Sequence, residues 1–370
     1  MLSPLDDYPV HQIAEPIRFV GTSDRNFYDR YYFQGHPRAG GLVLTAGLGA
    51  YPNRDVCDAF LAVSDGGAQR VVRASRQLGV DRTDTRCGPF RVEVVEPLRR
   101  LRVVLEPGPY ELACDLTWTG SIPCHWEPDQ VIRHGAQLTT ATKRFAQTSR
   151  LSGTLEVAGE RFRVEPSGWW GNRDRSWGVR MGLGEPEAPG ARTAQPRLGF
   201  FWIYCIAQFE AFSLLALVEE DREGRRRLSH ATRVWNDPAR PVEDLGHVEH
   251  AIELAPGTRC ARRGALRFER RGGATTELRF ETGPCCFLGL GTGYGVEPEW
   301  RHGMWQGAGP VVQERRYDVS RPGELGSRAG LNDNLARFEL EGLRGSGLFE
   351  FAVLGPYAPY GFASGKDVAR

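Results

Sequence analysis

The sequence predicts an all-β protein in which two antiparallel β-barrels follow one another along the chain. Three observations support this prediction. Short apolar or alternating runs recur at the spacing of strands. Gly (45 residues) and Pro (24 residues) are abundant, which favours many turns between those strands. Long runs rich in Leu, Ala, Glu and Lys, which would predict helices, are missing from the 370 residues.

The first half of the chain contains a series of runs that indicate strands. A segment such as "RVEVVE", residues 91–96, alternates with a period of two, which is typical of a strand with one buried face. Gly and Pro lie in the joints between the runs and indicate hairpin turns. A weak helical periodicity over 129–148 predicts a helix there. The strand runs of this half are 41–48, 58–64, 69–76, 90–97, 100–107, 111–120, 151–159 and 161–170.

A joint in the middle of the chain divides the strand pattern into two halves. Residues 181–197 are rich in Gly, Pro and Ala without periodicity, which indicates a linker or a long loop. The strand pattern then restarts, and residues 265–282 form a hairpin signal of two alternating runs around a Gly-Gly pair. We therefore expect an N-terminal β-domain over 1–185 and a C-terminal β-domain over 186–370.

Composition limits the class of protein. The formal net charge of +1 gives no electrostatic footprint for a nucleic-acid partner, and the basic run at 222–227 is expected to be a solvated hairpin loop. The N-terminus lacks the apolar region of a signal peptide, and no apolar run is long enough to span a membrane. The eight Cys contain no C-x-x-C pair, so we expect reduced, mostly buried thiols in a cytoplasmic protein.

The most unusual segment is "SGWWGNRDRSWGVR" at 167–180. In a regular strand it would have two faces, one with Trp170, Asn172, Asp174 and Ser176 and the other with Trp169, Arg173, Arg175 and Trp177. A bulge at Gly171 or Gly178 would mix the faces. In either case Asp174 lies within reach of guanidinium groups and indoles. Two interpretations stay open, a catalytic carboxyl group or a structural ion pair that ties two sheets together.

The segment "RDRSWG" at 173–178 resembles the acid-x-Ser/Asn-Trp-Gly signature of the lipocalin-like carotenoid 1,2-hydratases (hydroxyneurosporene synthases, CrtC). It is also similar to the Glu-Lys-Asn-Trp-Gly segment of tocopherol cyclases; AttH-like proteins and fungal lipocalin-like Diels-Alderases belong to the same group. Asp174 matches the acid, Arg175 the basic residue and Ser176 the Asn, before Trp177 and Gly178. Ser at 176, and Arg in place of His or Lys at 175, depart from the pattern. Segments such as "GPFRVEVVEPLRRLRV" resemble a two-domain bacterial family over roughly the whole chain.

This resemblance implies two tandem lipocalin-like barrels, AttH/CrtC-like, with a cleft or lumen for a hydrophobic molecule and with no metal or organic cofactor. The relatives protonate, hydrate, cyclise or reshape an apolar skeleton. A carboxylic acid whose pKa is raised by an apolar site can protonate an alkene or an ether oxygen. Indole faces can stabilise the carbocation that develops. The resemblance therefore favours Asp174 as proton donor or shuttle, with Arg173 beside it.

Other segments supply further candidates. Tyr28 and Tyr32, in "TSDRNFYDRYYFQG", could act on a phenol or ketone or could pack at a barrel rim. Arg73 could orient Asp174 or bind a substrate oxygen, or it could point outward into solvent. His302, in "GYGVEPEWRHGMWQG", could be a general base, a polar anchor or a structural histidine. The candidates for catalysis are Asp174, Arg173, His302 and Tyr28, and those for substrate binding are Trp169, Trp177, Arg73, Tyr32, Tyr294, Trp300 and Trp305.

Metal and nucleotide sites are not expected. In "HVEH", residues 247–250, the two His would point to opposite faces of a strand. The Gly-rich residues 289–295 lack the Lys and the following helix of a P-loop. The sequence also contains no G-x-S-x-G nucleophile elbow.

The resulting hypothesis is a cofactor-independent lyase, hydratase or isomerase (cyclase) that acts by acid–base chemistry on a hydrophobic aromatic or terpenoid molecule in a β-barrel cleft. The alternative is a non-catalytic lipocalin-type carrier of a lipophilic ligand. A carrier does not need a buried Asp174 that faces a cavity, so the surroundings of this residue discriminate between the two. The expected partner is a hydrophobic small molecule, and a homodimer is possible.

Overall fold

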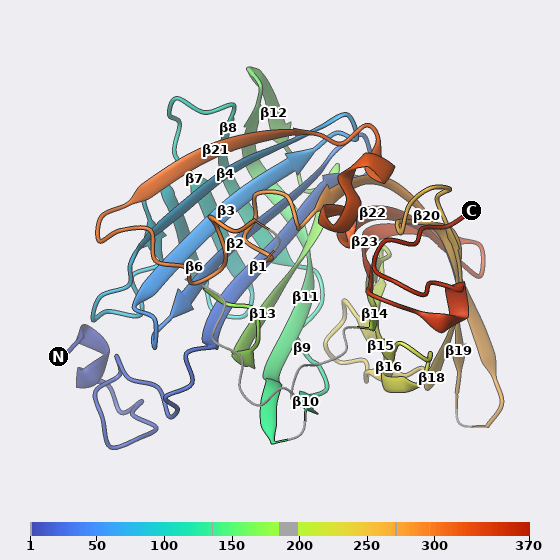
Figure 1. Cartoon of the computed structure of the whole chain (residues 1–370), viewed down its shortest axis with the longest axis horizontal. Coiled ribbons are helices and arrows are strands. Elements are labelled where there is room, and N and C mark those ends of the chain that lie inside the picture. The colour runs from blue at the N-terminus through green and yellow to red at the C-terminus, as the bar shows by residue number, and fades with distance from the viewer. Residues whose placement is uncertain (1, 135, 185–198, 271, 296) are drawn as a thin grey trace.

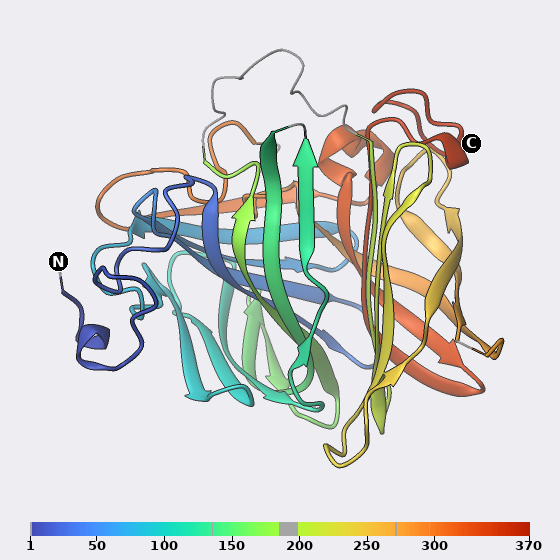
Figure 2. The ribbon, with the colours of Figure 1, turned by 90° about the horizontal axis from the view of Figure 1, so that it is seen from below.

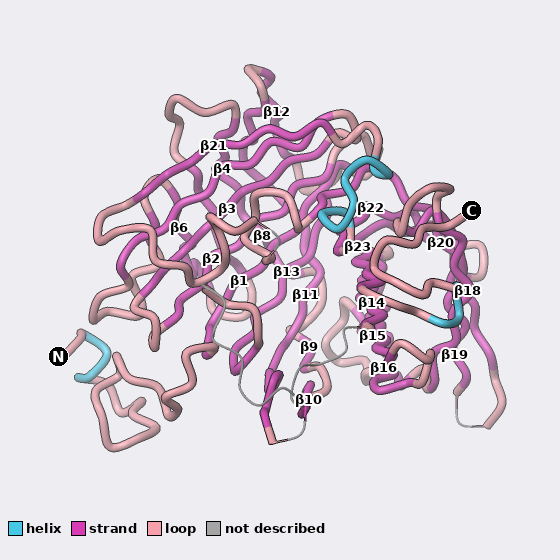
Figure 3. Tube along the Cα trace, viewed as in Figure 1, coloured by secondary structure: helices cyan, strands magenta, loops and turns pink. Residues whose placement is uncertain are grey.

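The computed structural model describes residues 2–134, 136–184, 199–270, 272–295 and 297–370. Within them, nearly all regular structure is β, and it forms two antiparallel sheets that each curl into a half-barrel (Figures 1 and 3). The helical residues form short 3₁₀ segments, η1 (Pro4–Asp7), η3 (Pro322–Ala329) and η4 (Ala358–Tyr360). The prediction of an all-β protein with two barrel-like halves is confirmed.

The first sheet has 14 strands. Most lie along one path in the order β21-β4-β3-β2-β1-β13-β11-β8-β7-β6-β5, while β9, β10 and β12 pair with β11. The bounds are β1 (Phe27–Pro37), β2 (Val43–Tyr51), β3 (Val56–Ser64), β4 (Ala68–Gln77), β5 (Arg86–Cys87), β6 (Phe90–Glu96), β7 (Arg100–Leu105), β8 (Leu112–Gly120), β9 (His125–Trp126), β10 (Gln130–His134), β11 (Gln137–Val157), β12 (Glu160–Val164), β13 (Trp169–Arg180) and β21 (Val311–Asp318).

The second sheet has nine strands in the order β17-β16-β15-β14-β23-β22-β20-β19-β18. Its two edges approach each other, because the Val248 backbone N–H of β18 donates a hydrogen bond to Oγ of Ser229 in β16 at 3.0 Å. The bounds are β14 (Phe200–Gln208), β15 (Phe212–Asp221), β16 (Arg226–Trp235), β17 (Glu243–Asp244), β18 (His247–Leu254), β19 (Ala261–Glu269), β20 (Thr275–Phe287), β22 (Leu331–Leu340) and β23 (Leu343–Leu354).

The helix predicted over 129–148 is wrong, because β10 and the first part of β11 occupy these residues. The segment is rich in Thr, and β-branched side chains favour strands over helices. Its residues also alternate between two apolar environments. Phe145 lines a hollow inside the first half-barrel, whereas Ala146 packs against the second sheet. Apolar contacts on both faces around Phe145 and Ala146 obscure the period of two that identifies a strand with one wet face.

Two turn predictions are confirmed. The hairpin expected at 265–282 is formed by β19 and β20, and both Gly272 and Gly273 between them have positive φ angles. Glycine adopts this left-handed conformation without steric cost. The basic run at 222–227 includes the turn between β15 and β16, with a positive φ at Gly224.

Each sheet encloses its own apolar core, and further apolar clusters lie where the two sheets meet. Strand β1 shows how the sequence separates these environments. Phe33 points into the first core, against Trp118, with ring centroids 5.1 Å apart. Tyr32, on the opposite face of the strand, belongs to a cluster that includes Leu335 of the second sheet. Alternate residues of β1 therefore face either the inside of the first half-barrel or the second sheet. Figure 2 shows the two curled sheets side by side.

Strand β21 belongs by sequence to the second half but by pairing to the first sheet. Its residues pair with β4 from Val311 opposite Ser75 to Asp318 opposite Ala68. The other strands after residue 198 form the second sheet. The division into 1–185 and 186–370 stays a prediction, and most of the predicted linker, 185–197, lies outside the described residues.

All eight cysteines are free thiols, and six of them are buried, as the sequence predicts. Among the described residues, no helix has the length and apolar character needed to cross a membrane. The cytoplasmic location and the possible homodimer stay predictions.

Candidate functional site

A cavity of about 450 Å³ lies where the two sheets face each other. One wall is the outer face of β1, β11 and β13, and the opposite wall comes from β14 and β23 of the second sheet. The loop before β21 completes the lining with Tyr294 and His302. Both halves of the chain therefore build this cavity, which we call the inter-sheet cavity.

Asp174 lies in this cavity, at the centre of the first-sheet wall. Regular pairing places it opposite Tyr32 of β1 and opposite Ala146 of β11, so no bulge mixes the two faces of β13. No side chain in the described part of the chain donates a hydrogen bond to its carboxyl group. Burial raises the pKa of Asp174 to about 7 and outweighs the opposing effect of the Arg144 guanidinium. Asp174 is therefore close to half-protonated at neutral pH.

The positive charge of Arg144 is largely neutralised by another carboxylate. Its Nε donates a hydrogen bond to Glu127, whose Oε1 also accepts a hydrogen bond from the Tyr204 hydroxyl at 2.8 Å. The Arg144 guanidinium also lies 4.7 Å from the Tyr204 ring centroid and 5.5 Å from that of Trp202. This arrangement explains why Arg144 does not hold Asp174 in its ionised form.

A pair of carboxyl groups extends the acidic part of the site. Asp333 and Glu350 are directly opposite each other on β22 and β23. The Tyr32 hydroxyl donates a hydrogen bond to Asp333, and Nε1 of Trp202 donates one to Glu350 at 2.5 Å. Burial, and for Asp333 also repulsion by Glu350, raises the pKa of both groups. Burial and mutual repulsion therefore favour a protonated form of this pair beside the cavity, which Glu350 lines.

His302 is neutral and firmly packed. Its ring meets the Tyr294 ring edge-to-face, with centroids 4.6 Å apart. Its Nδ1 lies 3.6 Å from Oδ2 of Asp58, which accepts a hydrogen bond from the Gly303 backbone N–H at 2.7 Å. Burial and the nearby Arg30 charge lower the pKa of His302 to about 3, against the opposing effect of Asp58. A neutral imidazole can accept or donate a hydrogen bond, but it does not carry a proton to give at neutral pH.

The structure brings together five of the candidates that the sequence suggests. The inter-sheet cavity is lined by Asp174, Tyr28, Tyr32, Tyr294 and His302.

The other candidates lie elsewhere. Arg173 and Trp177 are on the opposite face of β13 from Asp174, so the expectation that they flank this carboxyl group is not met. Trp169 is in the core of the first half-barrel, where its ring centroid is 6.4 Å from that of Phe162. The alternation of a strand, which separates neighbours in sequence onto opposite faces, explains all three.

Arg73, Trp300 and Trp305 also lie away from the lining of the inter-sheet cavity. Arg73 is fully buried, but it pairs with Glu297 at 2.5 Å and lies 4.5 Å from the Trp300 ring centroid. These contacts fasten the loop before β21 to β4, which is a structural role. The Trp305 side chain is 52% exposed.

Several lining residues were not identified as candidates from the sequence: Arg30, Arg144, Arg180, Trp202, Tyr204 and Glu350. Strand alternation places Arg30 on the same face as Tyr28 and Tyr32, so this residue could have been predicted from the sequence. Glu350 was also detectable, as a single carboxylate inside the apolar run "GLFEFAVLG". Arg144 was hidden by the incorrect helix prediction.

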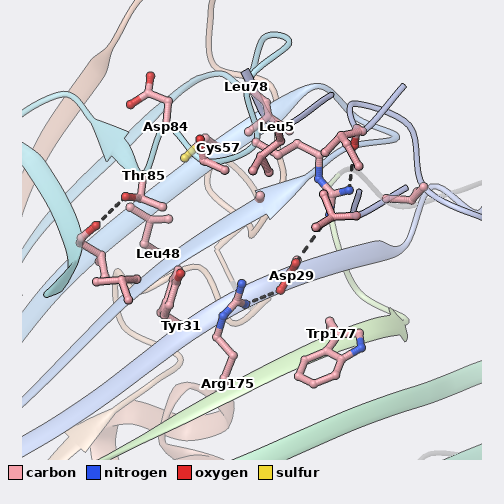
Figure 4. Close-up of a pocket in the computed structure, with 18 of the residues that line it drawn as sticks. Leu5, Asp29, Tyr31, Leu48, Cys57, Leu78, Asp84, Thr85, Arg175 and Trp177 are labelled. Atoms are coloured by element: carbon pink, nitrogen blue, oxygen red, sulfur yellow. Dashed lines mark hydrogen bonds and ion pairs between the residues drawn. The ribbon is translucent and has the colours of Figure 1, made fainter. Parts of the chain in front are cut away.

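A second, larger hollow of about 1160 Å³ lies inside the first half-barrel. Its lining combines apolar side chains such as Leu48 with a small ionic group (Figure 4). Arg175 forms an ion pair with Asp29 and lies 4.0 Å from the Tyr31 ring centroid. We call this space the barrel hollow. It has no access to Asp174, which is on the other face of the same sheet.

Within the part of the chain that the structure describes, no three His, Cys, Asp or Glu side chains are grouped so that they could hold a metal ion. The predicted independence from metals and organic cofactors stays a prediction.

Comparison with known proteins gives a family and a fold. A family model described as "Family of unknown function (DUF8625)" matches residues 2–363. No curated protein matches the chain. Among solved structures, a putative AttH from Nitrosomonas europaea is similar with a TM-score of 0.55 and 15% identity, over 93% of this chain and 97% of that chain. This likeness confirms the predicted AttH-like fold.

Two further solved structures are more distant. Kievitone hydratase from Nectria haematococca has a TM-score of 0.44 and 11% identity, over 90% of this chain and 93% of that chain. CghA with Sch210972 has a TM-score of 0.49 and 12% identity, over 89% of each chain.

Proposed function

The chain belongs to the family of unknown function whose model spans residues 2–363, and we propose that it is a cofactor-independent enzyme of the lyase, hydratase or isomerase (cyclase) class. Its substrate is a hydrophobic small molecule, aromatic or terpenoid, bound in the inter-sheet cavity. Asp174 is the group that gives and takes back a proton.

The observation that carries this proposal is the environment of Asp174. It is a carboxyl group with a pKa of about 7, without a hydrogen-bond partner among the described residues, in a cavity lined by aromatic rings. A general acid works best when its pKa is near the working pH. A structural ion pair would instead lower the pKa of the carboxyl group and would hold an Arg within contact distance. The geometry therefore supports the catalytic interpretation over the structural one.

The reaction that follows is acid–base chemistry on a carbon–carbon double bond or an ether. Asp174 transfers its proton to one carbon of the double bond, and the positive charge that develops on the other carbon is stabilised by the faces of Tyr28, Trp202 and Tyr294. In a hydration, water adds its oxygen to that carbon and loses a proton, which returns to Asp174. In an isomerisation or cyclisation, a neighbouring C–H bond loses the proton instead. Glu350, which lines the same cavity, accepts that proton in its ionised form.

The volume of the cavity restricts the substrate. At about 450 Å³ it is near the lower end of the range for small-molecule sites. It accommodates a compact ring system or a folded short terpenoid better than a long extended chain.

The second candidate function is that of a non-catalytic carrier. The barrel hollow favours it, because this space of about 1160 Å³ has many apolar lining residues and no access to Asp174. A carrier would bind its ligand in that hollow and would be indifferent to replacement of Asp174.

The experiment that tests the proposal is proton exchange in D2O. The protein is incubated with a panel of aryl alkenes and terpenoids, and deuterium in the recovered compounds is measured by mass spectrometry. Exchange reports hydration, isomerisation and cyclisation alike. We expect Asp174→Asn to reduce incorporation on the order of a hundred- to ten-thousand-fold, as loss of a general acid does. Asp115→Asn, at a distant and half-exposed Asp in β8, is the matched control and should retain exchange.

Two outcomes contradict the proposal. Equal exchange in the wild type and in Asp174→Asn would remove this residue from the chemistry. Tight binding of a panel member with no exchange by the wild-type chain would favour the carrier.

A further inference from the structure

The inter-sheet cavity contains two arginines without an acidic partner. Arg30 of β1 and Arg180 of β13 both lie close to Tyr294, and their guanidinium carbons are 5.1 and 5.5 Å from its ring centroid. Arg180 also lies 4.9 Å from the Tyr28 ring centroid. Neither guanidinium forms an ion pair with any carboxylate among the described residues.

Arg30 is the more unusual of the two, because it is only 3% exposed. None of its three guanidinium nitrogens has a hydrogen-bond partner in the described part of the chain. Arginine stays protonated in proteins, so this is a buried positive charge that has no hydrogen bond or ion pair among the described residues and on which the Asp58 carboxylate acts only at longer range. Such a charge costs stability unless something pairs with it.

The other guanidinium groups that line the cavity do have partners. Arg144 is hydrogen-bonded to Glu127, and Arg227 lies 3.7 Å from Oε1 of Glu219. The cavity is thus neutralised beside Arg144 and Arg227 and positive beside Arg30. The excess positive charge of the cavity therefore lies at the end that contains Arg30.

Neighbouring strand residues make space for the Arg30 side chain. A Cβ atom on Gly47 would lie 3.1 Å from Nη2 of Arg30, and one on Gly49 would lie 2.9 Å from its Cγ. The two glycines of β2 therefore form a shallow channel along which the side chain reaches the cavity. Nε2 of His302, in the lining of the same cavity, is also buried without a hydrogen-bond partner among the described residues.

We propose that the natural ligand of the inter-sheet cavity is a hydrophobic carboxylic acid whose carboxylate is bound between Arg30 and Arg180. The planar guanidinium group matches a carboxylate in bidentate geometry, and the contact that each arginine makes with the Tyr294 ring keeps both guanidiniums in the same part of the cavity. The apolar body of the ligand then extends toward Trp202 and Asp174. This inference rests on the proposed function, and it narrows the substrate to molecules with an acidic end and an apolar, unsaturated body.

The test compares two fluorescent probes with one ring system. 9-Anthracenecarboxylate carries the acidic group, and 9-anthracenemethanol is its neutral counterpart. Binding is measured by fluorescence anisotropy for the wild type, Arg30→Met, Arg30→Lys and Arg180→Met. We expect the wild type to prefer the carboxylate by at least about tenfold, the strength of a charge-assisted hydrogen bond. Arg30→Met and Arg180→Met should lose this preference, and Arg30→Lys should retain part of it.

Two further variants locate the binding site and control for net charge. Arg316→Met removes a charge from an exposed position of β21, where the side chain is 62% exposed, and should leave the preference unchanged. Arg175→Met removes a charge from the barrel hollow. Loss of the preference in Arg175→Met but not in Arg30→Met would place the carboxylate in the barrel hollow and would overturn the proposal.

Other results also overturn it. These are equal affinity of the wild type for the two probes, absence of binding of either probe, or an unchanged preference in Arg30→Met. Failure of the proposed function would be seen separately, because Asp174→Asn tests turnover whereas the probe preference is a binding measurement. Thermal unfolding of each variant verifies that it is folded, and removal of a buried charge that has no ion pair should not prevent folding.

Discussion

Replacing Asp174 by Asn should change how the stability of the protein depends on pH. In the folded chain burial holds the pKa of Asp174 at about 7, whereas its ordinary value is 3.8. Between these two values the folded chain keeps a proton that the unfolded chain releases. The free energy of unfolding of the wild type therefore falls as the pH rises from about 4 to about 7 and is level above that range. Asn does not titrate, so the variant lacks this fall.

The magnitude follows from the pKa difference. One pKa unit corresponds to about 1.4 kcal/mol, so the complete effect is about 4 kcal/mol. From about pH 5 to about pH 8 the wild type should lose about 2–3 kcal/mol relative to Asp174→Asn. The assay is urea unfolding followed by Trp fluorescence at several pH values, with the difference between the two proteins taken at each pH.

A matched control is Asp115→Asn. The Arg102 guanidinium holds the pKa of Asp115 below its ordinary value, so its contribution to stability is lost only as the pH falls into the acid range. Between about pH 5 and about pH 8 its curve should run parallel to that of the wild type. If the curve of Asp174→Asn is parallel as well, Asp174 is ionised in the folded chain, and the reasoning that makes it a general acid at neutral pH is refuted.

The remaining predictions concern the charges around the cavity. Without ligand, Arg30→Met should raise the free energy of unfolding by about 1–3 kcal/mol, because it removes a buried charge that has no ion pair. Arg144→Met should lower the free energy of unfolding by about 3–5 kcal/mol, because it leaves the Glu127 carboxylate buried without its ion pair. Urea unfolding measures both changes, and changes of the same sign and size would contradict the difference in pairing between the two arginines. Tyr32→Phe removes the hydrogen bond to Asp333 and should lower the free energy of unfolding by about 1–3 kcal/mol in the same assay. An unchanged free energy of unfolding would show that another group donates a hydrogen bond to Asp333 in the variant.

Strand alternation allowed part of the site to be predicted. It placed Asp174 and Ser176 on one face of the central segment and Arg173 and Trp177 on the other, and the structure has these two faces. The sequence could not show which face meets a cavity, because that depends on how two sheets pack. It could not show the partnership of Asp333 and Glu350 either, since cross-strand register is set by turns and by packing on both faces.

The grouping of aromatic residues around Asp174 was wrong for a related reason. Proximity in sequence was treated as proximity in space, but adjacent residues of a strand point in opposite directions. Trp169 and Trp177 therefore belong to the inside of the first half-barrel. The rings that do surround Asp174 include Trp202 and Tyr294, which lie far away along the chain and reach the cavity through strand pairing and a loop.

The pairing of β21 with β4 has a consequence for biosynthesis. The first half of the chain leaves the ribosome with one edge of its sheet open, because the strand that covers β4 comes about 240 residues later. At roughly 5–20 residues per second, that edge waits on the order of ten seconds to a minute for its neighbour. An uncovered edge is a template for pairing with other chains. We therefore expect a period during synthesis in which β4 of the nascent protein can pair with other chains, before β21 is available to cover it.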